Sequence, residues 1–114
     1  MTRQSKKDPR LAQLSALFEA SFQAAQAVHI EANAQVAALE QEIADLRDRH
    51  TQLGHTTKFD AADVLSAGRH KAWIMQQIKA LNLELARAMV VEHECREALA
   101  LENGRKQVLS KLVE

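Results

Sequence analysis

The chain has 114 residues, of which 46% are hydrophobic and only 4% are aromatic. This length is typical of one domain, and its supply of Ala and Leu suits a helical seam better than a thick globular core. Lys plus Arg and Asp plus Glu number 15 each, so no global charge attracts nucleic acid or an anionic membrane. A single Cys excludes an intramolecular disulfide.

The N-terminal residues carry a local excess of positive charge. Residues 3–10 contain Arg3, Lys6, Lys7 and Arg10 against Asp8 alone. They lack the apolar segment of a signal peptide, and no run in the chain approaches the roughly 18 apolar residues of a membrane span. We therefore expect a soluble, cytoplasmic protein that is peripheral to a membrane at most.

A first helix is predicted over residues of about 9–50. Asp8 can cap free backbone amides, and Pro9 suits the first helical position, where its missing N–H costs nothing. Apolar residues then recur in steps of three and four, which indicates an amphipathic helix with one apolar seam. They are Leu11, Leu14, Phe18, Phe22, Ala25, Val28, Ala32, Val36, Leu39, Ile43, Leu46 and Leu53.

A turn is predicted over residues of about 51–60. Gly54 lies there among turn-prone and β-branched residues. Thr57 and Asp60 are alternative caps for the helix that follows, because both side chains can accept a bond from a free amide.

A second helix is predicted over residues of about 61–112. Gly68 and Gly104 fall inside it, each weakening it by about 1 kcal/mol relative to Ala. Its seam consists of Val64, Ala67, Ile74, Ile78, Leu81, Leu85, Ala88, Cys95, Leu99, Leu109 and Leu112.

A short connection makes consecutive helices antiparallel neighbours. The predicted fold is therefore all-α, a single long antiparallel two-helix coiled-coil hairpin over residues 1–114. In this register Phe18 and Phe22 face Leu99 and Leu101. Both termini lie at the same end.

The sequence contains no constellation typical of catalysis, such as a phosphate-binding Gly-rich loop or a nucleophile elbow. His93 and Cys95 are two residues apart and so point to different sides of a helix, which does not suit zinc. We expect a non-enzymatic protein with no metal and no cofactor. Nucleic-acid binding is not expected either, since no basic stripe with interleaved aromatics is present.

Trp73 is the one tryptophan and lies beside the second seam. Two interpretations remain open: it anchors a partner, or it covers the seam near the turn by packing on Ile43 or Leu46. Apolar residues outside the seam also occur at 89–91, which favours a third helix, a partner or self-association.

The second helix resembles the flagellar FliJ family and its YscO-like relatives in type III secretion. The resemblance rests on residues 67–74 (AGRHKAWI), on Ile78 and Leu81, and on residues 97–112 (EALALENGRKQVLSKL), in which basic residues precede a Leu-x-Lys-Leu terminus. This chain is shorter than most members, lacks Tyr in the first helix and has Trp73 where Phe is usual.

The resemblance implies a stalk for a hexameric export ATPase, with the paired termini in the ring and the middle binding the export gate or substrate chaperones. We name the basic residues of both ends the basic tip, which would suit acidic ring loops. They are Lys6, Lys7, Arg10, Arg105, Lys106 and Lys111. The alternative is a scaffold or adaptor hairpin, unrelated to export, that forms a homodimer.

Overall fold

The computed structural model describes residues 9–54 and 60–113 and consists of two long helices. Helix α2 spans Pro9–Gly54 (46 residues) and helix α3 spans Ala61–Val113 (53 residues). They form an antiparallel helical hairpin, which confirms the predicted fold class. Neither helix has a stretch long and apolar enough to cross a membrane within these residues.

The boundaries follow from local chemistry. Helix α2 begins at Pro9 as predicted, but it continues to Gly54 instead of ending near residue 50. Thr51 fits into its last turns because its hydroxyl donates to the Arg47 carbonyl at 3.0 Å, a bond that the preceding turn always offers. The predicted turn therefore begins too early.

Asp60 is the cap of α3. Its side-chain Oδ1 accepts a hydrogen bond from the backbone N–H of Ala62 at 3.1 Å, and its carbonyl accepts one from Val64 at 3.0 Å. These bonds satisfy amides that have no partner within the helix. The alternative caps Thr57 and, for α2, Asp8 lie outside the described residues.

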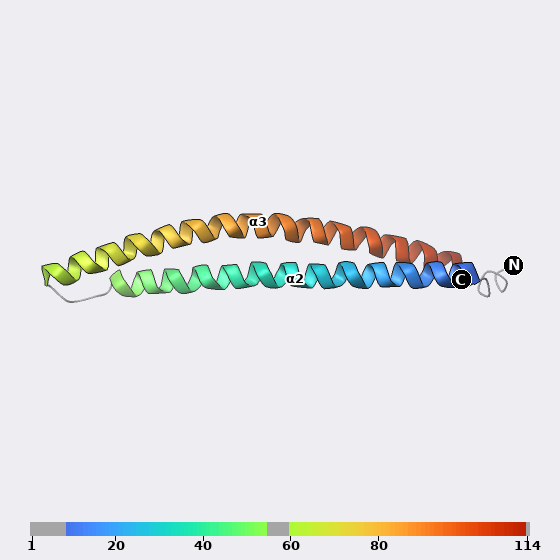
Figure 1. Cartoon of the computed structure of the whole chain (residues 1–114), viewed down its shortest axis with the longest axis horizontal. Coiled ribbons are helices and arrows are strands. Elements are labelled where there is room, and N and C mark those ends of the chain that lie inside the picture. Colours follow the sequence, from blue (N-terminus) through green and yellow to red (C-terminus); the bar gives the residue numbers. More distant parts are fainter. Residues whose placement is uncertain (1–8, 55–59, 114) are drawn as a thin grey trace. The chain divides into compact units, whose positions relative to one another are not determined.

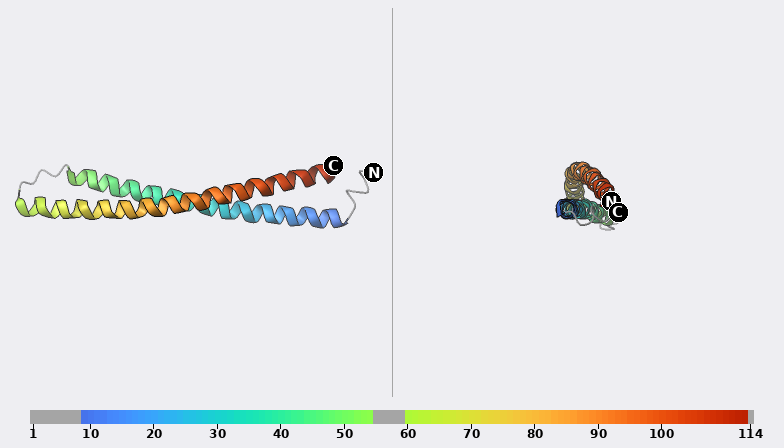
Figure 2. Two further views of the ribbon diagram at one scale, coloured as in Figure 1. Left: turned by 90° about the horizontal axis from the view of Figure 1, so that it is seen from above. Right: turned by 90° about the vertical axis from the view of Figure 1, so that its right-hand side faces the viewer.

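The chain divides into two compact units, each with one segment of each helix. Unit 1 comprises Met1–Asn33 and Val90–Glu114, and unit 2 comprises Ala34–Met89. Within each unit the two helical segments run in opposite directions (Figures 1 and 2). The start of α2 and the end of α3 thus belong to unit 1.

Unit 2 has an aliphatic core. Ile43, Ile74 and Ile78 are buried together, and Ile74 is fully buried. The partly buried side chains that pack against them are Leu46, Leu53, Leu81 and Leu85. This cluster follows from the three- and four-residue spacing, since it places large aliphatic residues on one stripe of each helix.

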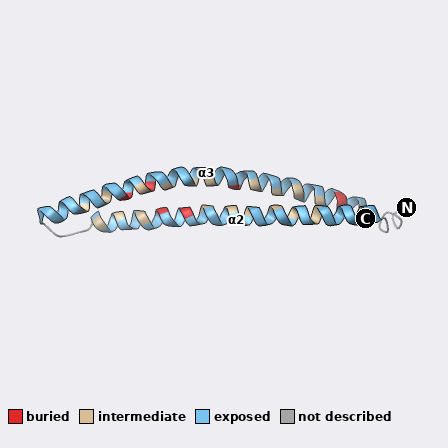
Figure 3. Ribbon diagram, viewed as in Figure 1, coloured by how far each residue is buried: buried red, intermediate tan, exposed pale blue. Residues whose placement is uncertain are grey.

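Unit 1 has less aliphatic packing. Of its described residues, Leu109 and Glu92 are buried, and most others are exposed (Figure 3). Small, partly buried side chains, among them Ala25, Ala32 and Cys95, occupy seam positions here. The hydrophobic contribution per turn is therefore smaller in unit 1 than in unit 2.

Four seam predictions are wrong. Val28 is 55% exposed, and the neighbouring His29 takes its place at the contact between the helices. Leu14, Val64 and Leu112 are also exposed. A step of three from Ala25 reaches Val28 and a step of four reaches His29. Both steps fit a helical seam, and hydropathy favoured the apolar Val28, which is the wrong residue.

Candidate protein-binding site

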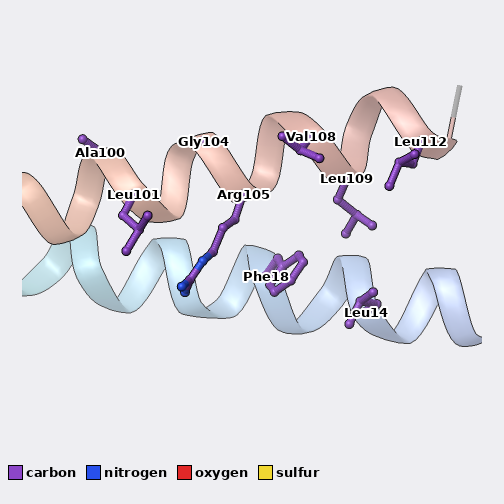
Figure 4. A pocket seen from close by; sticks show the side chains of 9 residues that line it. All are labelled: Leu14, Phe18, Ala100, Leu101, Gly104, Arg105, Val108, Leu109 and Leu112. Carbon is purple, nitrogen blue, oxygen red and sulfur yellow. The ribbon is translucent and has the colours of Figure 1, made fainter.

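An apolar groove of about 580 Å³ lies in unit 1, near the start of α2 and the end of α3. We call it the terminal groove (Figure 4). It is lined by Leu14, Phe18, Ala100, Leu101, Gly104, Arg105, Val108, Leu109 and Leu112. Apart from the Arg105 side chain, its lining is apolar.

The spacing of the residues on α3 explains the shape of the terminal groove. One face of α3 forms the edge of the groove with the side chains of Leu101, Val108 and Leu112. Beside this edge the groove is lined by Ala100 and Gly104, which have little or no side chain to cover the helix backbone. A side chain carbon at Gly104 would meet nothing within 4 Å. The absence of a side chain at this position therefore keeps the groove open.

The edge of the terminal groove is exposed. Leu101, Val108 and Leu112 keep 56%, 60% and 65% of their surface accessible. Single exposed aliphatic residues are common on proteins, but a contiguous set that lines a groove is typical of a binding surface. The sequence places Leu112 on the seam and Leu101 opposite Phe18 and Phe22, and it does not predict the groove.

Two ion pairs involve residues of the segment of α3 that lines the groove. Lys106 Nζ lies 2.9 Å from Glu19 Oε2 on α2 and 4.6 Å from the centroid of the Phe22 ring. Arg105 Nη1 lies 3.1 Å from Glu102 Oε1. The Phe22 ring, which the sequence places opposite Leu99 and Leu101, also has the ammonium of Lys106 over its face.

The residues of the basic tip are placed as follows. Arg10, Arg105, Lys106 and Lys111 all belong to unit 1, and Lys6 and Lys7 lie outside the described residues. Arg105 and Lys106 are each paired with a carboxylate of the same unit. The net positive charge at this end is thus lower than a count of its basic residues suggests.

Trp73 belongs to unit 2 and does not line the terminal groove. Its side chain is 48% exposed and its ring stacks on that of His70, with centroids 5.9 Å apart and planes 13° from parallel. An exposed, pre-ordered aromatic ring of this kind suits an anchor for a partner.

A second cluster of unit 1 joins His29, Glu92 and Arg96, which we call the polar layer. His29 Nε2 lies 3.1 Å from Glu92 Oε1, and Arg96 Nη2 lies 2.6 and 2.7 Å from the two oxygens of that carboxylate. Sequence reasoning missed His29 and Glu92 as contact residues. The available signal was the seam spacing, since Glu92 lies four residues after Ala88 and three before Cys95.

No metal site is formed in residues 9–54 and 60–113, where no three His, Cys, Asp or Glu side chains gather closely enough. His93, one of the residues considered in the sequence, instead pairs with Glu97 on the same helix at 3.1 Å. No protein-family model, curated protein or solved structure matches the chain.

Two carboxylates of unit 1 have perturbed acidity. The hydrogen bond from Lys106 lowers the pKa of Glu19, and those from Arg96 and His29 lower the pKa of Glu92. A lowered folded-state pKa means that each contact contributes stability above the unfolded value of about 4.3 and loses it as the pH falls further.

The Tm of thermal unfolding should consequently fall as the pH is lowered from about 4.3 toward 3. We expect Glu19→Gln to lower the Tm at pH 7 and to make the fall in Tm between pH 7 and pH 3 shallower, because Gln does not titrate. Circular dichroism melting curves of both proteins over this range measure the effect. An identical pH dependence in the two proteins would contradict a contribution from the Glu19–Lys106 contact.

Proposed function

We propose that this chain is a non-enzymatic helical hairpin that binds a protein partner through the terminal groove. The observation that carries this proposal is the groove itself, an open apolar channel whose edge consists of exposed aliphatic side chains. Burial of such an apolar surface against a partner lowers the free energy of the complex and so favours binding.

The shape and charge of the groove favour a helical partner with acidic residues. An amphipathic helix can place apolar residues at three- and four-residue spacing into such a channel. Arg105 lines the groove, and Lys111 is exposed beside its last residue, Leu112. Carboxylates flanking the partner's apolar face would lie close to these cations.

The partner that we propose is the hexameric ATPase of a flagellar or type III export apparatus. The support is the FliJ-like pattern of the second helix, which ends in the residues that line the groove. On this proposal the protein acts in the cytoplasm as a stalk, with unit 1 bound to the ATPase ring. Trp73 and other exposed residues of unit 2 would bind the export gate or substrate chaperones.

The test is a titration of the export ATPase from the same organism with this protein, measuring ATP hydrolysis and ring assembly together. We expect saturable stimulation of hydrolysis accompanied by formation of the ATPase oligomer. If neither quantity changes at saturating concentrations of a folded hairpin, the ATPase is not the partner.

A homodimeric scaffold is the second candidate. Met89, Val90 and Val91 are each about half exposed, although they are large and apolar, and a second copy could cover them. Sedimentation equilibrium distinguishes the two functions, since a scaffold is a tight dimer on its own and a stalk is a monomer or a weak oligomer.

A further inference from the structure

The polar layer is unusual for a helical seam because it contains a buried charge. The side chains of His29 and Glu92 are only 18% and 10% exposed, and Glu92 is the buried charged residue of the described chain. A buried carboxylate is costly unless it is paired and hydrogen-bonded. Here three hydrogen bonds from Arg96 and one contact with His29 fulfil that requirement.

The apolar seams around this layer discriminate poorly between alternative alignments of the helices. In unit 1 the neighbouring seam residues include Ala25, Ala32 and Cys95, whose small side chains fit many partners. In unit 2 the aliphatic residues repeat with heptad spacing, as in Leu39, Leu46 and Leu53. A slip of one heptad would therefore bring aliphatic residues opposite aliphatic residues again.

We propose that the pair His29 and Glu92, held by Arg96, sets the register of the hairpin and thereby aligns the two walls of the terminal groove. A slip of one heptad moves one helix by about 10 Å along the other. In one direction it brings Phe22 opposite Glu92 in place of His29. The buried carboxylate then loses its partner on α2, at a cost that the apolar seams do not offset.

The alignment matters for the groove because its walls come from different helices. Leu14 and Phe18 belong to α2, whereas the opposite wall, from Ala100 to Leu112, belongs to α3 (Figure 4). A one-heptad slip would move Phe18 away from Leu109 by about 10 Å. His29 and Glu92 thus act as positioning residues for a surface that they do not line.

Spin labels can measure the register directly. In a Cys95→Ala background, cysteines replace Ser15 on α2 and Gln107 on α3, which are exposed positions of unit 1. Double electron–electron resonance should give one narrow distance when the polar layer is intact. The double variant His29→Leu with Glu92→Leu should give a second distance population of comparable size, shifted by up to about 10 Å.

The Tm of this double variant distinguishes a change of register from a loss of the folded structure. We expect its Tm to equal or exceed that of the parent protein, because apolar replacements of buried polar or charged partners, made on both sides of the contact, are commonly neutral or stabilising. The matched control is His29→Lys, which keeps a hydrogen-bond donor opposite Glu92 and should retain one distance. One unchanged distance in the Leu/Leu variant, or two distances in the Lys variant, would overturn the proposal.

The measurement does not depend on the identity of the partner. If the Leu/Leu variant shows two distances but stimulates the ATPase normally, the polar layer sets the register and the terminal groove is not the binding site. If it shows one distance and stimulates normally, the polar layer does not set the register, and the proposal for the groove is unaffected.

Discussion

Ile74→Ala is expected to lower the free energy of unfolding by about 2–5 kcal/mol, the range found when a fully buried aliphatic side chain is truncated to Ala. Ile74 has no exposed surface and packs with Ile43 and Ile78 in the core of unit 2. Small domains have total stabilities of about 5–15 kcal/mol, so this single change removes a large part of the total.

Trp73 gives a local readout of the Ile74 variant. It is the one tryptophan of the chain and belongs to the same unit, so its fluorescence during urea unfolding reports on unit 2. The matched control is Leu83→Ala, an exposed position on the same helix, which should change the free energy by less than about 0.5 kcal/mol. Equal effects of the two variants would contradict the placement of the core.

The second large effect concerns binding. We expect the double variant Leu101→Asp with Val108→Asp to weaken binding of the export ATPase at least about tenfold, which corresponds to about 1.4 kcal/mol. Both side chains are more than half exposed on the edge of the terminal groove. The carboxylates would keep water in the groove and would repel an acidic partner.

The control for this variant is Leu65→Asp with Leu83→Asp, which places the same charges at exposed leucines of unit 2. Affinity is measured from the concentration dependence of ATPase stimulation, and circular dichroism verifies that both variants are helical. If the two double variants bind alike, the groove is not the contact surface.

Reversing the charges of the basic tip would be a weaker test. Lys106 is paired with Glu19 and covers the Phe22 ring, so Lys106→Glu would place two carboxylates together and disturb unit 1 itself. A loss of binding would then have two causes. The groove variants avoid this problem, because Leu101 and Val108 are exposed.

The secondary structure was predictable because its determinants are local. Pro9 at the first helical position, the Asp60 cap and the three- and four-residue spacing each act within one or two turns of helix. The aliphatic core was predictable for a related reason. From Val36 the apolar residue at a step of three or four is Leu39, from Leu39 it is Ile43, and from Ile74 it is Ile78. All three are buried.

The sequence by itself thus determined two long helices, their antiparallel pairing and the core of unit 2. Only the tertiary structure decided that His29, and not Val28, faces Glu92, that Lys106 covers Phe22, and where the terminal groove opens. The physical reason is that local preferences specify a helix but not its rotation about its own axis or its register against another helix. Those are set by contacts between residues far apart in the chain, including the buried contact between His29 and Glu92, two residues that hydropathy assigns to solvent.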